Sequence, residues 1–182
     1  MSKEDRIIEA ATDVFLRYGY VRTTMRDVAE RAGISRPALY LVFPRKDDIF
    51  AAVLRHLSET ALQEYRRTLP QLPTLEEKLH FCCEKWGAHG FDLAEVHPDS
   101  KDLFDPSFAP VREMYADFAA FLAELLAEPV AASALPSTPE ELAYALVSSM
   151  RGFEEFADDG AHMRRMIALQ VNVVCAAVRE RE

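Results

Sequence analysis

Apolar positions along the chain follow the period of an α-helix. From Ile7 to Tyr18 they recur three or four residues apart, and the same spacing returns in later segments. The alternation of apolar and polar residues that marks a half-buried strand is missing throughout the sequence. The pattern therefore predicts an all-α fold of about nine helices. The expected helical segments are 2–18, 24–32, 35–43, 47–69, 74–86, 111–128, 140–157 and 161–182, and short helical turns within 87–110 complete the count.

Residues that begin and end helices support these boundaries. Thr24 and Asp27 have the spacing of a capping box, and Gly33 is suited to the turn that follows the short helix. Ser35 can cap the next helix, where Pro37 in the first turn lacks only an N–H that would be unpaired in any case. Three short, well-marked helices are therefore expected before residue 45.

Glycine and proline interrupt the helical pattern in two later places. Residues 87–110 contain two glycines and several prolines, which predicts a loop with short helical turns. Residues 129–139 are expected to form a linker. Gly19 is expected to stop the first helix in a left-handed conformation.

The segment 24–43 has the pattern of a helix-turn-helix. This motif requires two short helices, a tight turn, apolar residues where the helices cross and polar residues on the outer face of the second helix. The expected shared core is Val28, Ala32, Ile34, Leu39 and Val42. In DNA-binding proteins the second helix of such a motif lies in the major groove.

Side chains around this motif have the chemistry of DNA contacts. Arg36 can bond guanine edges bidentately, whereas Ser35 and Tyr40 are suited to phosphate or sugar. Hydroxyl groups and a lysine on either side of the motif can hold phosphates. The predicted DNA-contacting residues are Thr23, Thr24, Ser35, Arg36, Pro37, Tyr40 and Lys46. For Lys46 the alternative is a solvated charge beside Asp47 and Asp48.

The run from Gly19 to Ile49, GYVRTTMRDVAERAGISRPALYLVFPRKDDI, resembles the N-terminal signature of regulators of the tetracycline-repressor (TetR) type. The resemblance covers roughly the first 55 residues. It implies a homodimer whose C-terminal helices pair across a two-fold axis and enclose an effector pocket. It also implies DNA-contacting roles for Thr24, Arg36, Tyr40 and Lys46. Val42 departs from the family, in which a His or Tyr that contacts phosphate often stands at this position.

The distribution of charge fits a protein that meets DNA with one end. The net charge is −9, yet residues 1–55 hold 10 Lys and Arg against 8 Asp and Glu.

The cysteines and the apolar runs bear on the location of the protein. The three cysteines do not have the spacing of a disulfide framework, which predicts a reducing compartment. No apolar run is long enough for a membrane span. We therefore expect a cytoplasmic location without membrane association.

The body of the chain supplies expectations for a ligand pocket and a subunit interface. Aromatic residues near the irregular 87–110 stretch could line a helix-bounded cavity, although core packing is their ordinary role. The candidate pocket residues are Trp86, Phe104, Tyr115, Phe118 and Phe153. The candidate homodimer residues, from a small-residue stripe and an apolar stripe, are Ala145, Ser149, Gly152, Ile167, Val171, Val174 and Val178.

These observations predict a DNA-binding domain in residues 1–46 and an effector-binding and dimerisation domain in residues 47–182. The predicted function is a ligand-responsive repressor that binds an inverted-repeat operator in double-stranded DNA and is released by a small-molecule effector. No cofactor and no catalytic residue are predicted.

Two other classes of function remain open at this point. The first is a helical ligand-binding protein whose N-terminal module contacts proteins. The second is a small enzyme that uses His80 or a cysteine. A metal site built from Cys82, Cys83, His80 and Glu84 is disfavoured, because adjacent cysteines point in different helical directions.

Overall fold

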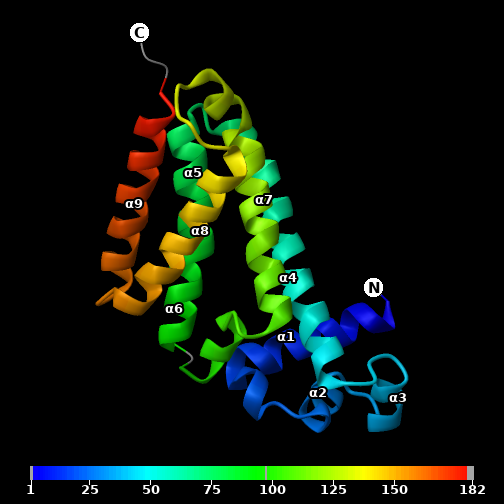
Figure 1. The fold of residues 1–182 in the computed structure, drawn as a ribbon. Coiled ribbons are helices and arrows are strands. Elements are labelled where there is room, and N and C mark those ends of the chain that lie inside the picture. The colour runs from blue at the N-terminus through cyan, green and yellow to red at the C-terminus, as the bar shows by residue number, and fades with distance from the viewer. Residues whose placement is uncertain (1, 97, 180–182) are drawn as a thin grey trace. The chain divides into compact units, whose positions relative to one another are not determined.

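The computed structural model describes residues 2–96 and 98–179 (Figure 1). These residues form nine α-helices joined by short turns, and none of them lies in a strand, so the all-α prediction is confirmed. The α-helices are α1 (Lys3–Arg22), α2 (Met25–Arg31), α3 (Arg36–Tyr40), α4 (Lys46–Thr68), α5 (Leu75–Cys83), α6 (His89–Val96), α7 (Ala109–Ala132), α8 (Pro139–Phe156) and α9 (Gly160–Ala177). A π-helical turn, η2 (Glu84–Ala88), separates α5 from α6, and the 3₁₀ segments are η1 (Leu69–Gln71) and η3 (Pro98–Phe104).

Capping boxes begin four of the helices. The caps of α1, α2, α5 and α8 are Ser2, Thr24, Thr74 and Thr138, and each hydroxyl accepts a bond from the backbone N–H three residues later. The acidic side chain at that third position bonds back to the cap, so two helix-end donors are satisfied together. Local sequence alone therefore fixes where these helices begin.

The structure corrects the predicted end of the first helix. Gly19 does adopt a positive φ of 75°, but its backbone makes a kink inside α1, and the helix resumes as far as Arg22. The last predicted helix ends at Ala177 instead of continuing, and its predicted end at residue 182 lies outside the described residues.

Two predicted irregular segments contain more helix than expected. Residues 89–96 form α6, and residues 98–104 form the 3₁₀ helix η3. α7 continues through Pro129 to Ala132. Pro129 lacks an N–H and therefore removes one backbone hydrogen bond from the last turns of the helix. The burial of Val130, the next residue, offsets this loss.

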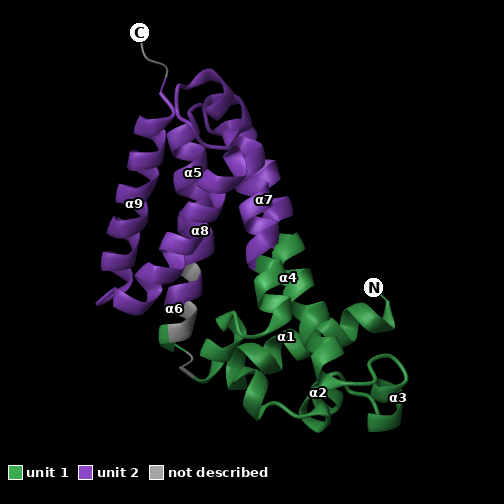
Figure 2. Cartoon of the chain, viewed as in Figure 1, with its two compact units in different colours: residues 1–60, 93–114 green, residues 61–92, 115–182 purple. Residues whose placement is uncertain are grey.

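The chain divides into two compact units (Figure 2). Unit 1 comprises residues 1–60 and 93–114, and unit 2 comprises residues 61–92 and 115–182. Helices α4 and α7 each pass from one unit into the other along the chain. Compactness and function are different properties, so the functional boundary between residues 46 and 47 stays a prediction.

Unit 1 is built around an aromatic cluster. Phe15 and Phe50 are fully buried and meet edge to face, with ring centroids 5.6 Å apart. Tyr20 lies 4.5 Å from the Phe50 ring, and Phe108 lies 5.1 Å from the Tyr20 ring. Residues from α1, α4 and the segment before α7 therefore share one core.

Unit 2 is a helical bundle with a large apolar core. Leu79, Leu122, Leu126, Leu146 and Ile167 come from α5, α7, α8 and α9 and are at most 1% exposed. They belong to one continuous cluster of buried side chains. Burial of this kind is the main favourable contribution to the stability of a helical domain.

Candidate nucleic-acid interface

Helices α2 and α3 form the predicted helix-turn-helix. Gly33 between them has a φ of 66°, which is a conformation that residues with a Cβ rarely adopt. The amide of Ile34 donates to the carbonyl of Ala29 at 3.0 Å and closes the turn. Val28 and Leu39 are fully buried, so each helix contributes an anchor to the small shared core. The turn and the two anchors therefore set the arrangement of α2 and α3 from residues that are close together in the chain.

The outer face of α3 is open to solvent. Ser35 begins the helix, and its hydroxyl accepts a bond from the amide of Ala38 at 3.3 Å. The residues exposed on this helix include Arg36 and Pro37, and 42% of the Tyr40 surface is accessible. Leu41, which follows α3, is 85% exposed. An exposed Arg beside exposed aromatic and apolar groups can read base edges in a major groove.

The two threonines before α2 have different surroundings. Thr24 is exposed at the start of α2, where its hydroxyl oxygen accepts the amide of Asp27 at 3.3 Å. Thr23 is only 2% exposed, and its hydroxyl donates to the carbonyl of Gly19 at 2.6 Å. In this structure the Thr23 side chain stabilises the kinked end of α1 through this hydrogen bond. Its predicted contact with phosphate stays a prediction.

Lys46 connects the start of α4 with the segment after the kink. Its Nζ donates to the carbonyl of Tyr20 at 2.7 Å and to that of Thr23 at 3.0 Å. The same nitrogen lies 4.2 Å from the centroid of the Tyr20 ring, within cation–π distance. The ammonium group therefore has a clear intrachain role, and its predicted phosphate contact stays a prediction.

Tyr20 also pairs with the start of α4 through its hydroxyl. The phenol donates to the carboxylate of Asp47 in a short hydrogen bond. Partial burial and this carboxylate raise the pKa of Tyr20 to about 12. The phenol is therefore a neutral donor at physiological pH, and it holds α1 and α4 together.

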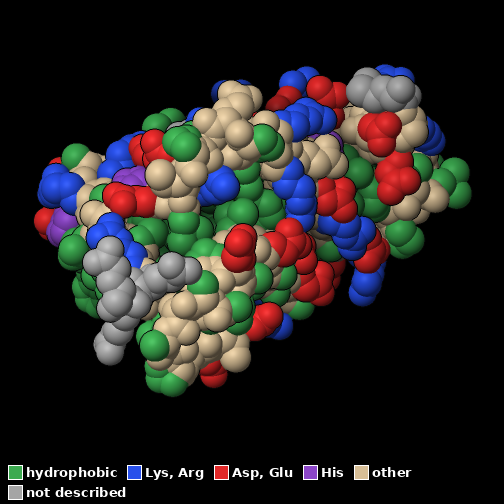
Figure 3. Space-filling model, turned by 90° about the horizontal axis from the view of Figure 1, so that it is seen from above, with side chains coloured by type: hydrophobic (Ala, Val, Ile, Leu, Met, Phe, Trp, Pro, Cys, Tyr) green, Lys and Arg blue, Asp and Glu red, His purple; other side chains and the backbone are tan. Residues whose placement is uncertain are grey.

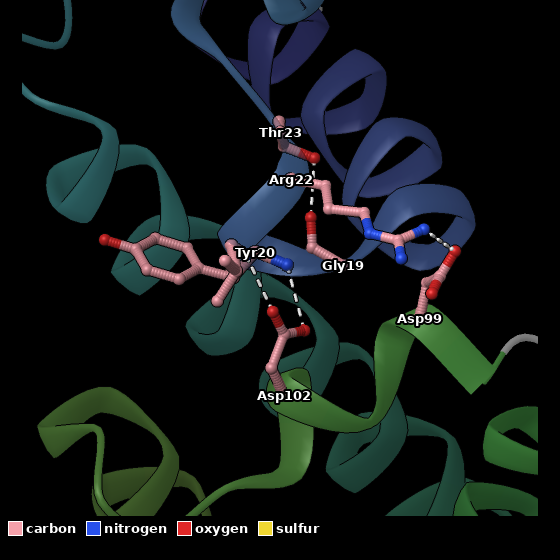
Figure 4. A network of polar contacts seen from close by, with 7 residues as sticks. Gly19, Tyr20, Arg22, Thr23, Asp99 and Asp102 are labelled. Carbon is pink, nitrogen blue, oxygen red and sulfur yellow. Dashed lines mark hydrogen bonds and ion pairs between the residues drawn. The ribbon is translucent and has the colours of Figure 1, made fainter.

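A second set of contacts, which sequence reasoning missed, comes from η3. The carboxylate of Asp102 accepts the backbone amides of Tyr20 at 2.9 Å and of Val21 at 2.7 Å (Figure 4). Asp99 pairs with the guanidinium of Arg22 at 2.5 Å. About 80 residues separate the partners, and no local pattern marks such a pair.

Charged side chains of both signs accompany this surface. In unit 1, Arg26 pairs with Glu30 at 2.7 Å and Arg45 with Asp48 at 2.7 Å. Figure 3 views the molecule from above, and on that face too Lys and Arg are interspersed with Asp and Glu. Both ion pairs are exposed, so their net energies are small and their cations remain open to a competing phosphate.

The predicted pocket residues fall in both units. Phe104 lies in unit 1, whereas the other four lie in unit 2. The indole of Trp86, in the π-helical turn, stacks on the fully buried Phe118 with centroids 4.2 Å apart and an interplanar angle of 4°. Tyr115 and Phe153 are half-buried and pack against the same core. A role for these residues in ligand binding stays a prediction.

A polar group lies beside these aromatic residues in unit 2. Arg151 pairs with Glu154, and its guanidinium lies 5.9 Å from the centroid of the Tyr115 ring. Burial raises the pKa of Tyr115 and the pKa of Glu154 above their usual values. An apolar wall with a few fixed polar groups is typical of small-molecule sites.

The predicted dimer residues divide by burial. Four of them, Ile167, Val171, Val174 and Val178, are at most 6% exposed and pack in the core of their own chain. These four therefore leave little surface for a partner, because the apolar stripe of α9 is needed to cover α5 and α8. By contrast, Ala145 and Gly152 are exposed on α8, and Ser149 is half-buried. Tyr144, Leu169 and Val173 are also exposed, at 70%, 57% and 54%.

The cysteines are buried as small apolar residues. Burial raises the pKa of the Cys82 thiol to about 12 and that of Cys83 further, so thiolate chemistry is suppressed. In the described part of the chain, no group of three or more His, Cys, Asp or Glu is arranged to hold a metal ion. No described helix is long and apolar enough to cross a membrane.

Comparison with known proteins identifies the class of this fold. The sequence model for "Bacterial regulatory proteins, tetR family" matches residues 7–53. The HTH-type transcriptional regulator RutR of Escherichia coli (strain K12) is 27% identical over 168 residues, which cover 86% of this chain and 76% of RutR. An uncharacterized HTH-type transcriptional regulator of Bacillus subtilis, YfiR, is 33% identical over 113 residues, and the match covers 62% of this chain but about half (49%) of YfiR.

Solved structures extend the likeness beyond the matched N-terminal residues. A transcriptional regulator from Cytophaga hutchinsonii superposes with a TM-score of 0.73 over 94% of this chain and 96% of that one, at 20% identity. Similarity at this level of identity concerns the fold. The helical body is therefore of the same type as in known regulators, in addition to the matched N-terminal helices.

Proposed function

We propose that this chain, which belongs to the tetR family of bacterial regulatory proteins, is a ligand-responsive repressor that binds an inverted-repeat operator as a homodimer. The observation that carries the proposal is the exposed face of α3 in a helix-turn-helix inside the matched segment. Arg36 is the residue best suited to read guanine, and Tyr40 and Thr24 are suited to the DNA backbone.

A homodimer is supported by apolar side chains that face outward on α8 and α9. Tyr144 on α8 and Leu169 and Val173 on α9 are each more than half exposed in the single chain. The exposed Ala145 and Gly152 would permit close approach of a second helix pair. Two copies related by a two-fold axis would present two α3 helices to two operator half-sites.

An effector site in unit 2 is supported by the aromatic and polar groups around Trp86 and Arg151. A ligand that binds one conformation better than the other would shift the population between DNA-binding and released states. A shift from 1:99 to 99:1 requires about 5.5 kcal/mol of differential binding energy. Helix α4 continues along the chain from unit 1 into unit 2, so it can transmit a ligand-dependent conformational change in unit 2 to the helix-turn-helix.

The proposal is tested by DNA binding of the purified full chain to fragments of its own upstream region at two salt concentrations. Selective binding should weaken with salt by about 0.9 in log K per log salt for each phosphate neutralised. Arg36→Ala should weaken selective binding by about 1–3 kcal/mol, which is about 5- to 150-fold. Arg67→Ala removes the same charge from an exposed position in unit 2 and should leave affinity close to that of the wild type.

Two results would contradict the proposal. Equal effects of Arg36→Ala and Arg67→Ala would show that α3 does not read the sequence. A folded dimer without selective binding would favour a helical ligand-binding protein that uses its N-terminal module for protein contacts. Sedimentation of Leu169→Glu beside wild type tests the dimer separately, because a charge at that surface should shift the protein toward monomer.

A further inference from the structure

A carboxylate from a distant segment bonds to the backbone at the kinked end of α1. Gly19 interrupts the helical backbone with φ 75° and ψ 168°, and the amides of the next two residues, Tyr20 and Val21, point to the two oxygens of Asp102 (Figure 4). Hydrogen bonds to an ionised acceptor are stronger than those between neutral groups. All of these residues lie in unit 1.

The backbone of Gly19 packs closely against Asp99 and Asp102 of η3. A Cβ at Gly19 would lie 2.0 Å from the backbone carbonyl oxygen of Asp99 and 2.8 Å from a carboxylate oxygen of Asp102. Only glycine therefore permits η3 to approach the kink. Thr23, whose hydroxyl donates to the Gly19 carbonyl, is buried in the same place.

The segment held in this way leads directly into the DNA-binding motif. One residue after Thr23, Thr24 caps α2, so the position of residues 20–23 fixes where the helix-turn-helix begins. The other side of this segment is held by Lys46, which donates to the carbonyls of Tyr20 and Thr23. Two groups therefore hold residues 20–23: Asp102 accepts bonds from backbone amides of this segment, and Lys46 of α4 donates bonds to its backbone carbonyls.

We propose that Asp102 is a positioning residue for DNA binding, which orients the helix-turn-helix by holding the amides of Tyr20 and Val21. The inference rests on the proposed function and adds to it a residue outside the matched segment 7–53. Because η3 follows α6 and precedes α7 in the chain, this carboxylate ties the start of the motif to the stretch that joins two body helices. Loss of the contact would leave the motif folded but less well placed.

The substitution Asp102→Asn separates positioning from electrostatics by the sign of its effect. The amide keeps one acceptor oxygen and puts an NH₂ donor against the second backbone donor, so only one of the two bonds can be retained. Removing a negative charge from a DNA-binding protein should by itself tighten binding. We expect the opposite, which is a loss of affinity of about tenfold, the size of one charge-assisted bond.

Asp99→Asn is the matched control in the same segment. It removes the same charge three residues away, but it breaks only an exposed ion pair with Arg22. Its affinity should equal or slightly exceed that of wild type. Asp102→Glu keeps both acceptors on a longer side chain, and it should recover part of the lost affinity.

The experiment combines hydrogen exchange with DNA binding, both on the full-length chain. Exchange at the amides of Tyr20 and Val21 should accelerate in Asp102→Asn and not in Asp99→Asn, while the unfolding transition stays cooperative. Faster exchange at these amides with wild-type affinity for the upstream DNA would overturn the inference and leave the proposed function intact. Absence of selective DNA binding by the wild type would overturn both.

Discussion

Units 1 and 2 combine polar contacts and apolar packing in different proportions. In unit 1, polar contacts between distant segments accompany a small aromatic core, as in the bonds of Asp102, Lys46 and Asp47 to the end of α1. In unit 2, the helices share a long apolar core in which Phe118 and Leu126 are fully buried. Directional polar bonds fix the orientation of an element, whereas apolar packing contributes mainly stability. Unit 1 is therefore suited to orient a motif, and unit 2 to provide stability.

This comparison implies that changes in core volume should matter most in unit 2. Phe118→Ala removes a fully buried ring that stacks on Trp86, and it should lower the free energy of unfolding by about 3–5 kcal/mol. Urea denaturation at a fixed protein concentration measures the change. The control is Leu41→Ala, which truncates an apolar residue that is 85% exposed in unit 1 and should change stability by less than about 0.5 kcal/mol. Similar losses in the two variants would contradict the assignment of the core.

Matched capping boxes in the two units sharpen the comparison. Thr24→Ala in unit 1 and Thr138→Ala in unit 2 each remove a cap, and each should cost about 1 kcal/mol of stability. Thr24→Ala should also weaken DNA binding, because it loosens the start of α2 beside the proposed contact surface. Thermal unfolding and binding to the upstream DNA are measured on both proteins. Equal DNA affinity of the two variants would remove the functional distinction between these helix ends.

The smallest expected effect at neutral pH concerns the phenol of Tyr20. Its pKa is raised from 10 to about 12, so its contribution to stability is fully present below pH 10 and is lost as the pH rises through about 12. The tyrosinate absorbance of wild type minus that of Tyr20→Phe should therefore titrate near pH 12. A midpoint near pH 10 would show that the hydroxyl does not donate to Asp47 in solution.

Residue patterns in the first 50 positions predicted much of the candidate site. The caps Thr24 and Ser35, the turn at Gly33 and the buried Leu39 all follow from interactions within a few residues of one another. The exposed position of Arg36 follows from the same helical period. Short-range signals of this kind do not require knowledge of the rest of the fold.

The sequence was less informative where packing decides between two roles for the same residue type. The apolar stripe at Ile167 and Val171 was predicted to lie in a subunit interface, and the structure places these side chains in the core of their own chain. Lys46 resembled a solvated or phosphate-binding cation, and the structure shows it bonded to backbone carbonyls. Periodicity identifies an apolar face but does not identify what covers it.

The sequence by itself determined the helical class, most helix starts and the helix-turn-helix, because each depends on residues close together in the chain. Only the tertiary structure decided that Asp102 would meet the amides of Tyr20 and Val21, about 80 residues away. That contact requires the Gly19 kink and the approach of η3 at the same time. A hydrogen bond depends on distances of a few tenths of an ångström, and across such a separation these are set by the packing of the whole unit.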